Sequence, residues 1–146
     1  MKSTAPVSKI MTKELVTLQL TDDLYLAEKL FKTHKIRHLP VLDGKHLAGI
    51  LSYTDLLRIS YADLTAEEDT IETVVYDMFT VSQVMMNRPV VVSSETSIHD
   101  VAKILSEREF HALPVIDNNR LVGIVTTTDL IKYFLKNCPE FKNAKC

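Results

Sequence analysis

The chain has 146 residues and a formal net charge of −2, from 17 basic and 19 acidic side chains. This balance gives no excess of positive charge of the kind that binds nucleic acids or anionic membranes. No apolar run approaches the ~20 residues of a membrane-spanning helix. Cys138 and Cys146 both lie near the C-terminus, where they suit neither a disulfide framework nor a metal site. We therefore expect a cytoplasmic protein that needs no metal.

The chain contains an internal repeat. Displaced by 74 residues, it aligns with itself without a gap over residues 7–60, with about fifteen of about fifty positions identical. A unit of this size is marginal alone and tends to bury its apolar face against its twin. We assign residues 1–60 to the first repeat, 61–80 to a linker, 81–136 to the second repeat and 137–146 to a C-terminal tail.

Each repeat begins with a short apolar segment that ends in methionine, Val7–Met11 and Val81–Met85. A β-branched run follows and predicts a strand in each copy, Leu15–Leu18 and Val90–Val92.

An amphipathic helix comes next, because apolar residues recur three and four positions apart. These residues are Leu24, Ala27, Leu30 and Phe31 in one copy and Ile98, Val101, Ala102 and Leu105 in the other. The side chains just before each helix suit a helix N-terminus. They are Asp22 and Asp23, and Thr96 and Ser97.

Two apolar runs around a polar turn then predict a β-hairpin, since Asp-Gly and Asn-Asn pairs tolerate positive φ. In the first repeat the runs are Leu39–Leu42 and Leu47–Leu51, around residues 43–46; the second repeat has its turn at residues 117–120. A second helix closes each repeat, over about residues 52–59 and 126–135. The order strand, helix, strand, strand, helix defines a small α+β unit.

The linker carries six acidic residues and no lysine or arginine. Its loosely spaced apolar residues predict a helix that lays an apolar stripe on the core. We interpret the charge as a solvated face.

Three strings occur twice in the same order and spacing. They are Val7–Met11 with Val81–Met85, Leu39–Asp43 with Leu113–Asp117, and Gly49–Leu56 with Gly123–Leu130. On these strings the chain resembles a tandem pair of CBS (cystathionine-beta-synthase) domains over residues 7 to about 136. The resemblance implies an α+β fold in which two β-α-β-β-α repeats pack with pseudo-twofold symmetry into one module. It also implies two clefts that in many members hold AMP, ADP, ATP or S-adenosylmethionine, and a homodimer.

The strand-to-helix junction Gly49–Asp55, with its copy Gly123–Asp129, allows two interpretations. Its hydroxyl lies near a helix N-terminus, which favours an anion, and a carboxylate three residues later can accept hydrogen bonds from a ribose diol. The spacing is also close to a capping box, in which the same two side chains satisfy the N–H groups of the helix. The two roles do not exclude each other.

The resemblance assigns site roles residue by residue. Asp55 and Asp129 would bind ribose; Ser52, Thr54, Thr126, Thr128, Arg37, His38 and His111 would lie on the phosphate side. Apolar candidates for the adenine pocket are Val16, Ile36, Pro40, Ile50, Val90, Phe110, Pro114 and Ile124, which a plain core would also use. The resemblance implies a basic residue just before each Leu-Pro-Val strand, and Ala112 lacks that charge. We therefore expect Arg37 and His38 to supply most of the positive charge, unless they are a solvated pair at a strand edge.

These observations favour a regulatory module that binds an adenine nucleotide or S-adenosylmethionine, requires no cofactor, and acts on a separate target protein. The scattered Ser, His and Asp residues form no nucleophile–base–orienter set, so we expect no enzymatic activity. The alternative is a structural dimerisation module with empty or degenerate clefts.

Overall fold

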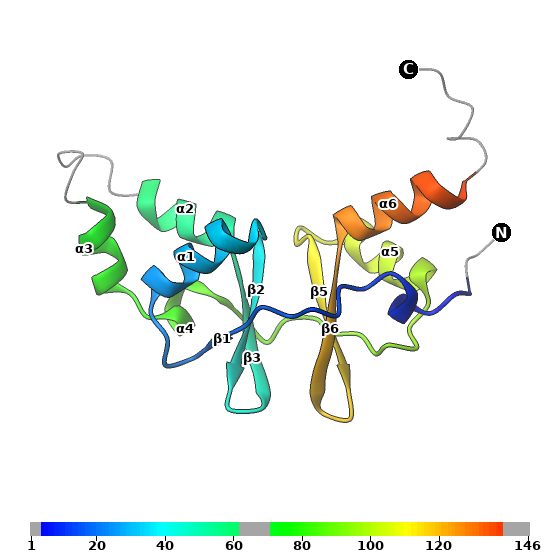
Figure 1. Ribbon diagram of the computed structural model, residues 1–146, viewed down its shortest axis with the longest axis horizontal. Helices are drawn as coiled ribbons and strands as arrows, with labels where there is room; N and C mark the ends of the chain where they lie inside the picture. The colour runs from blue at the N-terminus through cyan, green and yellow to red at the C-terminus, as the bar shows by residue number, and fades with distance from the viewer. Residues whose placement is uncertain (1–3, 62–70, 139–146) are drawn as a thin grey trace, which may run out of the picture. The chain divides into compact units, whose positions relative to one another are not determined.

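The computed structural model describes residues 4–61 and 71–138 and divides the chain into two compact units (Figure 1). The first-repeat unit is Val16–Pro89; the second-repeat unit joins Met1–Leu15 to Val90–Cys146. Each unit combines a β-hairpin with helices, so the α+β class and the two repeats are confirmed. None of the helices in the described part of the chain has the length and apolar character needed to span a lipid bilayer.

The first-repeat unit is built on a four-stranded sheet in the order β1-β2-β3-β4. Its strands are β1 (Leu18–Gln19), β2 (His38–Asp43), β3 (His46–Ser52) and β4 (Met86–Asn87). The β1–β2 pair is parallel and the other two pairs are antiparallel. The helices of this unit are α1 (Leu24–His34), α2 (Tyr53–Tyr61), α3 (Ile71–Met78) and α4 (Val81–Val84).

The second-repeat unit has the same plan around one antiparallel hairpin. Its elements are η1 (Val7–Lys9), α5 (Ile98–Glu107), β5 (Ala112–Asp117), β6 (Arg120–Thr126) and α6 (Thr127–Asn137). A parallel bridge joins Val92 to Val115, and an antiparallel bridge joins Thr12 to Ile124. At the offset of 74 residues, these bridges correspond to the Leu18–Val41 and Met86–Ile50 pairs of the first-repeat unit.

Helix starts and turns lie where the sequence predicts them. The carboxylate of Asp23 accepts the Leu26 N–H at 2.8 Å, and the Ser97 hydroxyl accepts the Asp100 N–H at 3.1 Å. Positive φ angles occur at Gly44 in one hairpin turn and at Asn118 and Asn119 in the other. The predictions of helix starts and hairpin turns, which rest on residues three or four positions apart, are therefore confirmed.

The predicted early strands were too long. The strand β1 begins only at Leu18, and within Val90–Val92 only Val92 pairs with a neighbour. The side chains of Val90 and Val91 are 38% and 43% exposed. A β-branched run forms a strand only where a partner strand lies beside it. In both repeats the neighbouring strand pairs only with the C-terminal end of the run.

The structure describes part of the segment that the sequence assigns to a linker. Residues 71–78 form the helix α3, and the side chains of Val75 and Tyr76 are buried in the first-repeat core. The side chain of Met78 is 63% exposed, so it does not belong to the buried stripe. Residues 62–70 lie outside the described part of the chain.

The two repeats exchange their opening segments. Residues 7–12 belong to the second-repeat unit, and residues 81–87 belong to the first-repeat unit. Thr12 and Ile124 exchange both backbone hydrogen bonds, at 2.8 and 3.0 Å, and β4 pairs with Gly49 and Ile50 of β3. The repeats in the sequence are therefore not the compact units in space.

A glycine lies at each point where an exchanged segment crosses the hairpin of the other repeat. A Cβ atom placed on Gly49 would lie 2.6 Å from the carbonyl oxygen of Met86 and 2.6 Å from the sulfur of Met85. One placed on Gly123 would lie 2.7 Å from the sulfur of Met11. At each of these glycines, the space that a Cβ would fill is thus taken by the methionine-ended segment of the other repeat.

We expect Gly49→Ala to lower the free energy of unfolding by about 1–3 kcal/mol, as overpacking does. The obstacle there is the Met86 backbone, which cannot move without breaking the β3–β4 pairing. Gly123→Ala should cost less, because its nearest neighbour is the flexible end of Met11 and the Thr12 carbonyl oxygen lies farther away, at 3.1 Å. Urea denaturation of both variants measures this order, and equal losses would contradict it.

Candidate functional site

Strand pairing brings together two groups of residues that lie apart in the sequence. In the β2–β3 register His38 lies opposite Ser52, and the Tyr53 N–H donates to the Arg37 carbonyl oxygen at 2.8 Å. The second repeat copies this arrangement: Ala112 lies opposite Thr126, and the Thr127 N–H donates to the His111 carbonyl oxygen at 2.9 Å. The basic residues before each hairpin therefore lie beside the N-terminus of the helix after it.

Each junction is a capping box. The Asp55 N–H donates to the Ser52 hydroxyl at 3.0 Å, and the Ser52 N–H donates to Oδ2 of Asp55 at 2.9 Å. Thr126 and Asp129 make the same reciprocal bonds at 3.2 and 3.0 Å. The capping interpretation is confirmed in both repeats.

The cap leaves hydrogen-bonding capacity on both carboxylates. A carboxylate has about four acceptor positions, and the cap uses Oδ2 of each aspartate. Oδ1 of Asp55 lies 3.9 Å from Nη1 of Arg58, and the Asp55 side chain is 21% exposed. The side chains of Thr54 and Thr128, in the first turn of each helix, are exposed.

The predicted adenine-pocket residues mostly contribute to the core. Pro40 pairs across the hairpin with Ile50, and Pro114 pairs with Ile124. All four residues are buried. Half-buried Val16, Ile36 and Phe110 pack against the core clusters, whereas Val90 is exposed.

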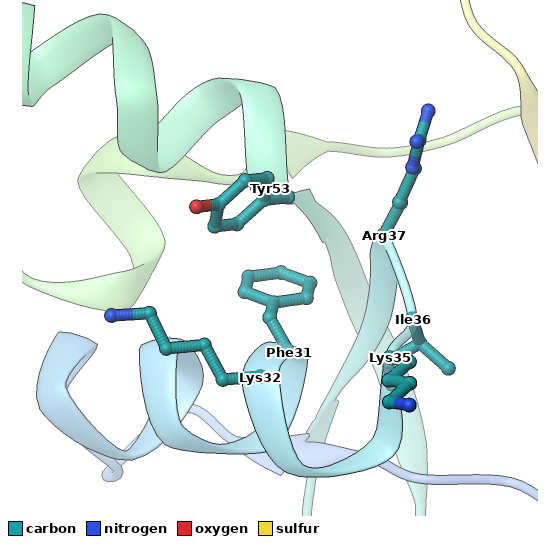
Figure 2. Close-up of a pocket in the computed structure, with 6 residues that line it drawn as sticks. All are labelled: Phe31, Lys32, Lys35, Ile36, Arg37 and Tyr53. Atoms are coloured by element: carbon teal, nitrogen blue, oxygen red, sulfur yellow. The ribbon is translucent and has the colours of Figure 1, made fainter.

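Arg37 and Ile36 line a pocket of about 260 Å³ in the first-repeat unit. Its other lining residues, which the sequence did not mark as site residues, are Phe31, Lys32, Lys35 and Tyr53. The rings of Phe31 and Tyr53 meet edge-on, with centroids 5.6 Å apart. Figure 2 shows Lys32 and Arg37 extending in different directions from this pair of rings. The pocket thus has an aromatic centre, and its cations do not converge on one point.

Lys32 is already engaged by a neighbouring carboxylate. Its ammonium group forms a salt bridge with Glu28, one turn earlier in α1. Burial acts to raise the pKa of Glu28, but hydrogen bonds from Lys32 and Tyr76 and the charge of Lys32 bring that pKa below its ordinary value. Arg37, whose side chain is exposed, is therefore a better candidate for a bound anion.

A second pocket, of about 330 Å³, surrounds Asp129 in the second-repeat unit. Its other lining residues are Lys9, Ile10, Lys132, Tyr133, Lys136 and Asn137. Of these residues, only Asp129 was predicted from the sequence as a site residue. Helical spacing from the capping box could have found Lys132 and Lys136, but Lys9 comes from the exchanged segment, which no local signal places here.

Within the described residues, no group of three or more His, Cys, Asp or Glu side chains is placed to hold a metal ion.

Two hairpin-and-helix repeats with capped strand-to-helix junctions define a tandem-repeat α+β protein. The CBS domain family model matches residues 7–62 and 81–136. The chain therefore belongs to the CBS domain family and carries a tandem pair of these domains.

Known proteins of this family are similar over most of the chain. A CBS domain-containing protein of Dictyostelium discoideum is 31% identical over 134 residues, which cover 89% of this chain and 91% of the relative. An uncharacterized protein of Methanocaldococcus jannaschii is 32% identical over 87% of this chain, which spans only 31% of that relative. The structure of CBSX2 in complex with AMP is 27% identical, covers 90% of this chain and 96% of its own, and has a TM-score of 0.73. CBSX2 is a CBS-pair protein from Arabidopsis thaliana.

We expect Thr126→Ala to lower the free energy of unfolding by about 1 kcal/mol, because the Asp129 N–H loses its capping partner. Thr128→Ala is the matched control, since its hydroxyl is exposed and lies outside the cap; it should stay within about 0.5 kcal/mol of the wild type. Chemical denaturation measures both values. Equal effects of the two substitutions would mean that the cap does not stabilise the fold.

Proposed function

We propose that this CBS-domain pair is a regulatory module that binds an adenine nucleotide at its strand-to-helix junctions and catalyses no reaction. The observation that carries the proposal is the duplicated junction. In each copy a half-buried aspartate, oriented by its cap, lies in the first turn of a helix next to a loop that carries arginine or histidine. Support comes from CBSX2, which is similar over nearly the whole chain and was solved in complex with AMP.

In this proposal Asp55 and Asp129 accept hydrogen bonds from the ribose hydroxyls. The cap holds each carboxylate in one orientation through Oδ2 and leaves acceptor positions for a diol. Because the carboxylate is oriented before the ligand arrives, little conformational entropy is lost on binding.

The phosphate side is assigned to the exposed hydroxyls of Thr54 and Thr128 and to the loop residues Arg37, His38 and His111. Helix N-termini favour anions through their unpaired N–H groups and the helix dipole. The first of these loops carries an arginine and a histidine, whereas the second carries one histidine, followed by Ala112. The first junction should therefore owe more of its charge to this loop than the second.

A regulatory role requires the ligand to bind two arrangements of the protein with different affinity. The hydroxyls of Ser52 and Thr126 serve the cap, which supports a binding role for these junctions rather than nucleophilic chemistry. The proposed target of the regulation is a separate protein.

The first test titrates AMP, ADP, ATP, NAD and S-adenosylmethionine in a thermal-shift assay. A ligand at ~100 times its dissociation constant stabilises the fold by about 2.7 kcal/mol, which raises Tm by several degrees. We expect such a shift with at least one adenine nucleotide. Asp129→Asn and Asp55→Asn keep an oxygen for the cap but lose charge and one acceptor, so together they should abolish the shift.

Asp117→Asn is the matched control, because it makes the same change in a hairpin turn away from the junctions. It should leave the ligand-induced shift unchanged. Wild-type protein that shows no shift with any of the five compounds would favour the structural pairing module instead.

The apolar face of α6 favours a second role, homodimerisation. Ile131, Phe134 and Leu135 lie three and four positions apart and are 53%, 37% and 58% exposed. In a twofold dimer the same stripe of both copies can be buried against itself, which would remove these side chains from water.

We expect the wild-type chain to sediment as a dimer and Leu135→Glu to shift it toward monomer, because a buried carboxylate without a partner is costly. Analytical ultracentrifugation over a range of concentrations gives the dissociation constant. Lys103→Glu, on the exposed surface of α5, is the control and should remain dimeric. A wild-type chain that is monomeric at all concentrations would rule this role out.

A further inference from the structure

We propose that the pocket of the first-repeat unit anchors an acidic peptide segment of a partner protein, with an aromatic side chain in the pocket and carboxylates at its rim. The pocket is the one of about 260 Å³ that Phe31, Tyr53 and four other residues line. This inference goes beyond nucleotide binding, because it gives the chemistry of a protein partner. It does not require a bound nucleotide, so it can fail separately from the proposed function.

The centre of the pocket is aromatic. The rings of Phe31 and Tyr53 meet with their centroids 5.6 Å apart and an interplanar angle of 67°, and Ile36 adds an apolar side chain. Aromatic rings favour edge-to-face contacts at about 4.5–7 Å, so a third ring finds suitable neighbours here. The volume lies just below the roughly 300 Å³ at which pockets for drug-sized molecules begin, and it suits a single side chain of a peptide.

The rim of the pocket is positively charged. The lining includes Lys32, Lys35 and Arg37 and no aspartate or glutamate, although the chain as a whole has a net charge of −2. Lys32 is paired with Glu28, whereas the ion pairs among the described residues include neither Lys35 nor Arg37. Both of these side chains are exposed. Charge complementarity therefore favours a partner that carries carboxylates.

The cations are spread around the rings. Figure 2 shows the side chains of Lys32, Lys35 and Arg37 pointing in different directions around Phe31 and Tyr53. One phosphate or one carboxylate can engage only one of these cations, whereas a peptide that crosses the pocket presents carboxylates on both sides of an anchor residue. An apolar centre within a polar rim is also the common organisation of protein interfaces. The spread of the cations thus favours an acidic peptide over a small organic acid.

Backbone hydrogen bonds hold the pocket in shape on both sides. At the end of α1, the Phe31 carbonyl oxygen accepts the N–H of Lys35 and, at 3.3 Å, the N–H of Ile36. At the start of α2, the Tyr53 N–H donates to the Arg37 carbonyl oxygen at 2.8 Å. A site that is formed before its partner arrives loses less conformational entropy on binding.

The second repeat lacks these features. At the offset of 74 residues, Leu105 and Thr127 stand in place of the two rings, and Glu109 stands in place of Lys35. The hairpin and the two helices form in that repeat without the rings and without the cation. The fold therefore does not require them, and the pocket distinguishes the first repeat from its copy.

Isothermal titration calorimetry of the full chain with the peptide acetyl-Glu-Asp-Phe-Asp-Glu-amide tests the inference. We expect binding with a dissociation constant below about 1 mM. Alanine in place of the central phenylalanine removes the anchor and should weaken binding about tenfold, as the loss of a central aromatic contact does. The uncharged peptide acetyl-Gln-Asn-Phe-Asn-Gln-amide should also bind more weakly, and added salt should weaken the acidic peptide, because it screens exposed charges.

Substitutions at Tyr53 locate the aromatic anchor. Tyr53→Thr introduces the residue type that the second repeat has at this position and should weaken peptide binding about tenfold. Tyr53→Phe is the matched control, since it keeps the ring and should bind the peptide like the wild type.

Substitutions of two lysines test the rim. Lys35→Asn removes a charge, and asparagine tolerates the positive φ of 53° at this position; the peptide should bind about threefold more weakly, as expected for a partly solvated ion pair. Lys45→Asn makes the same change in the hairpin turn at the other end of β2 and should leave the affinity unchanged.

A wild-type chain that does not bind the acidic peptide, or that binds it no more tightly than Tyr53→Thr and Lys35→Asn do, would overturn the inference. Loss of AMP binding in both variants with unchanged peptide binding would assign the pocket to the nucleotide and overturn it as well. Peptide binding without a thermal shift from any of the five adenine compounds would support the inference while the proposed function fails. A thermal shift without peptide binding would reject the inference alone.

Discussion

The close approach of two backbones at Gly49 and Gly123 is the constraint on which the rest of each unit depends. With no Cβ at these positions, the segments that carry Met85 and Met11 can cross the hairpin and pair with Ile50 and Ile124. The crossing covers a hairpin edge whose N–H and C=O groups would otherwise be open to another chain. The strand that carries each glycine also leads into a junction.

The junction combines a structural and a candidate functional role in the same atoms. The reciprocal bonds between Thr126 and Asp129 satisfy N–H groups that a helix N-terminus leaves unpaired. They also hold the carboxylate in one orientation before any ligand is present, which lowers the entropic cost of binding. A pattern that the fold needs in every unit therefore cannot by itself reveal whether a unit binds a ligand, and the surrounding charges must decide.

The sequence predicts those parts of the structure that depend on neighbours three or four residues apart. The caps at Asp23 and Ser97, the positive φ at Asn118 and the capping boxes are all of this kind. The exchange of Met11 and Lys9 into the unit of the second hairpin depends on contacts more than 100 residues apart, and no local pattern encodes these. Apolar candidates were equally ambiguous, because burial in the core and contact with adenine select the same residue types.

The differences between the two repeats lie where a ligand would distinguish them. The shared residues include the glycine of the crossing, the Leu-Pro-Val strand and the junction aspartate, so the fold is preserved in both copies. In the divergent pairs His38 and Ala112, and Lys136 and Ala62, one repeat has a histidine or lysine where the other has alanine. Positive charge lies in the loop before β2 in one unit and on α6 and η1 in the other. The two junctions therefore share the capping box and differ in the cations that line the neighbouring pockets.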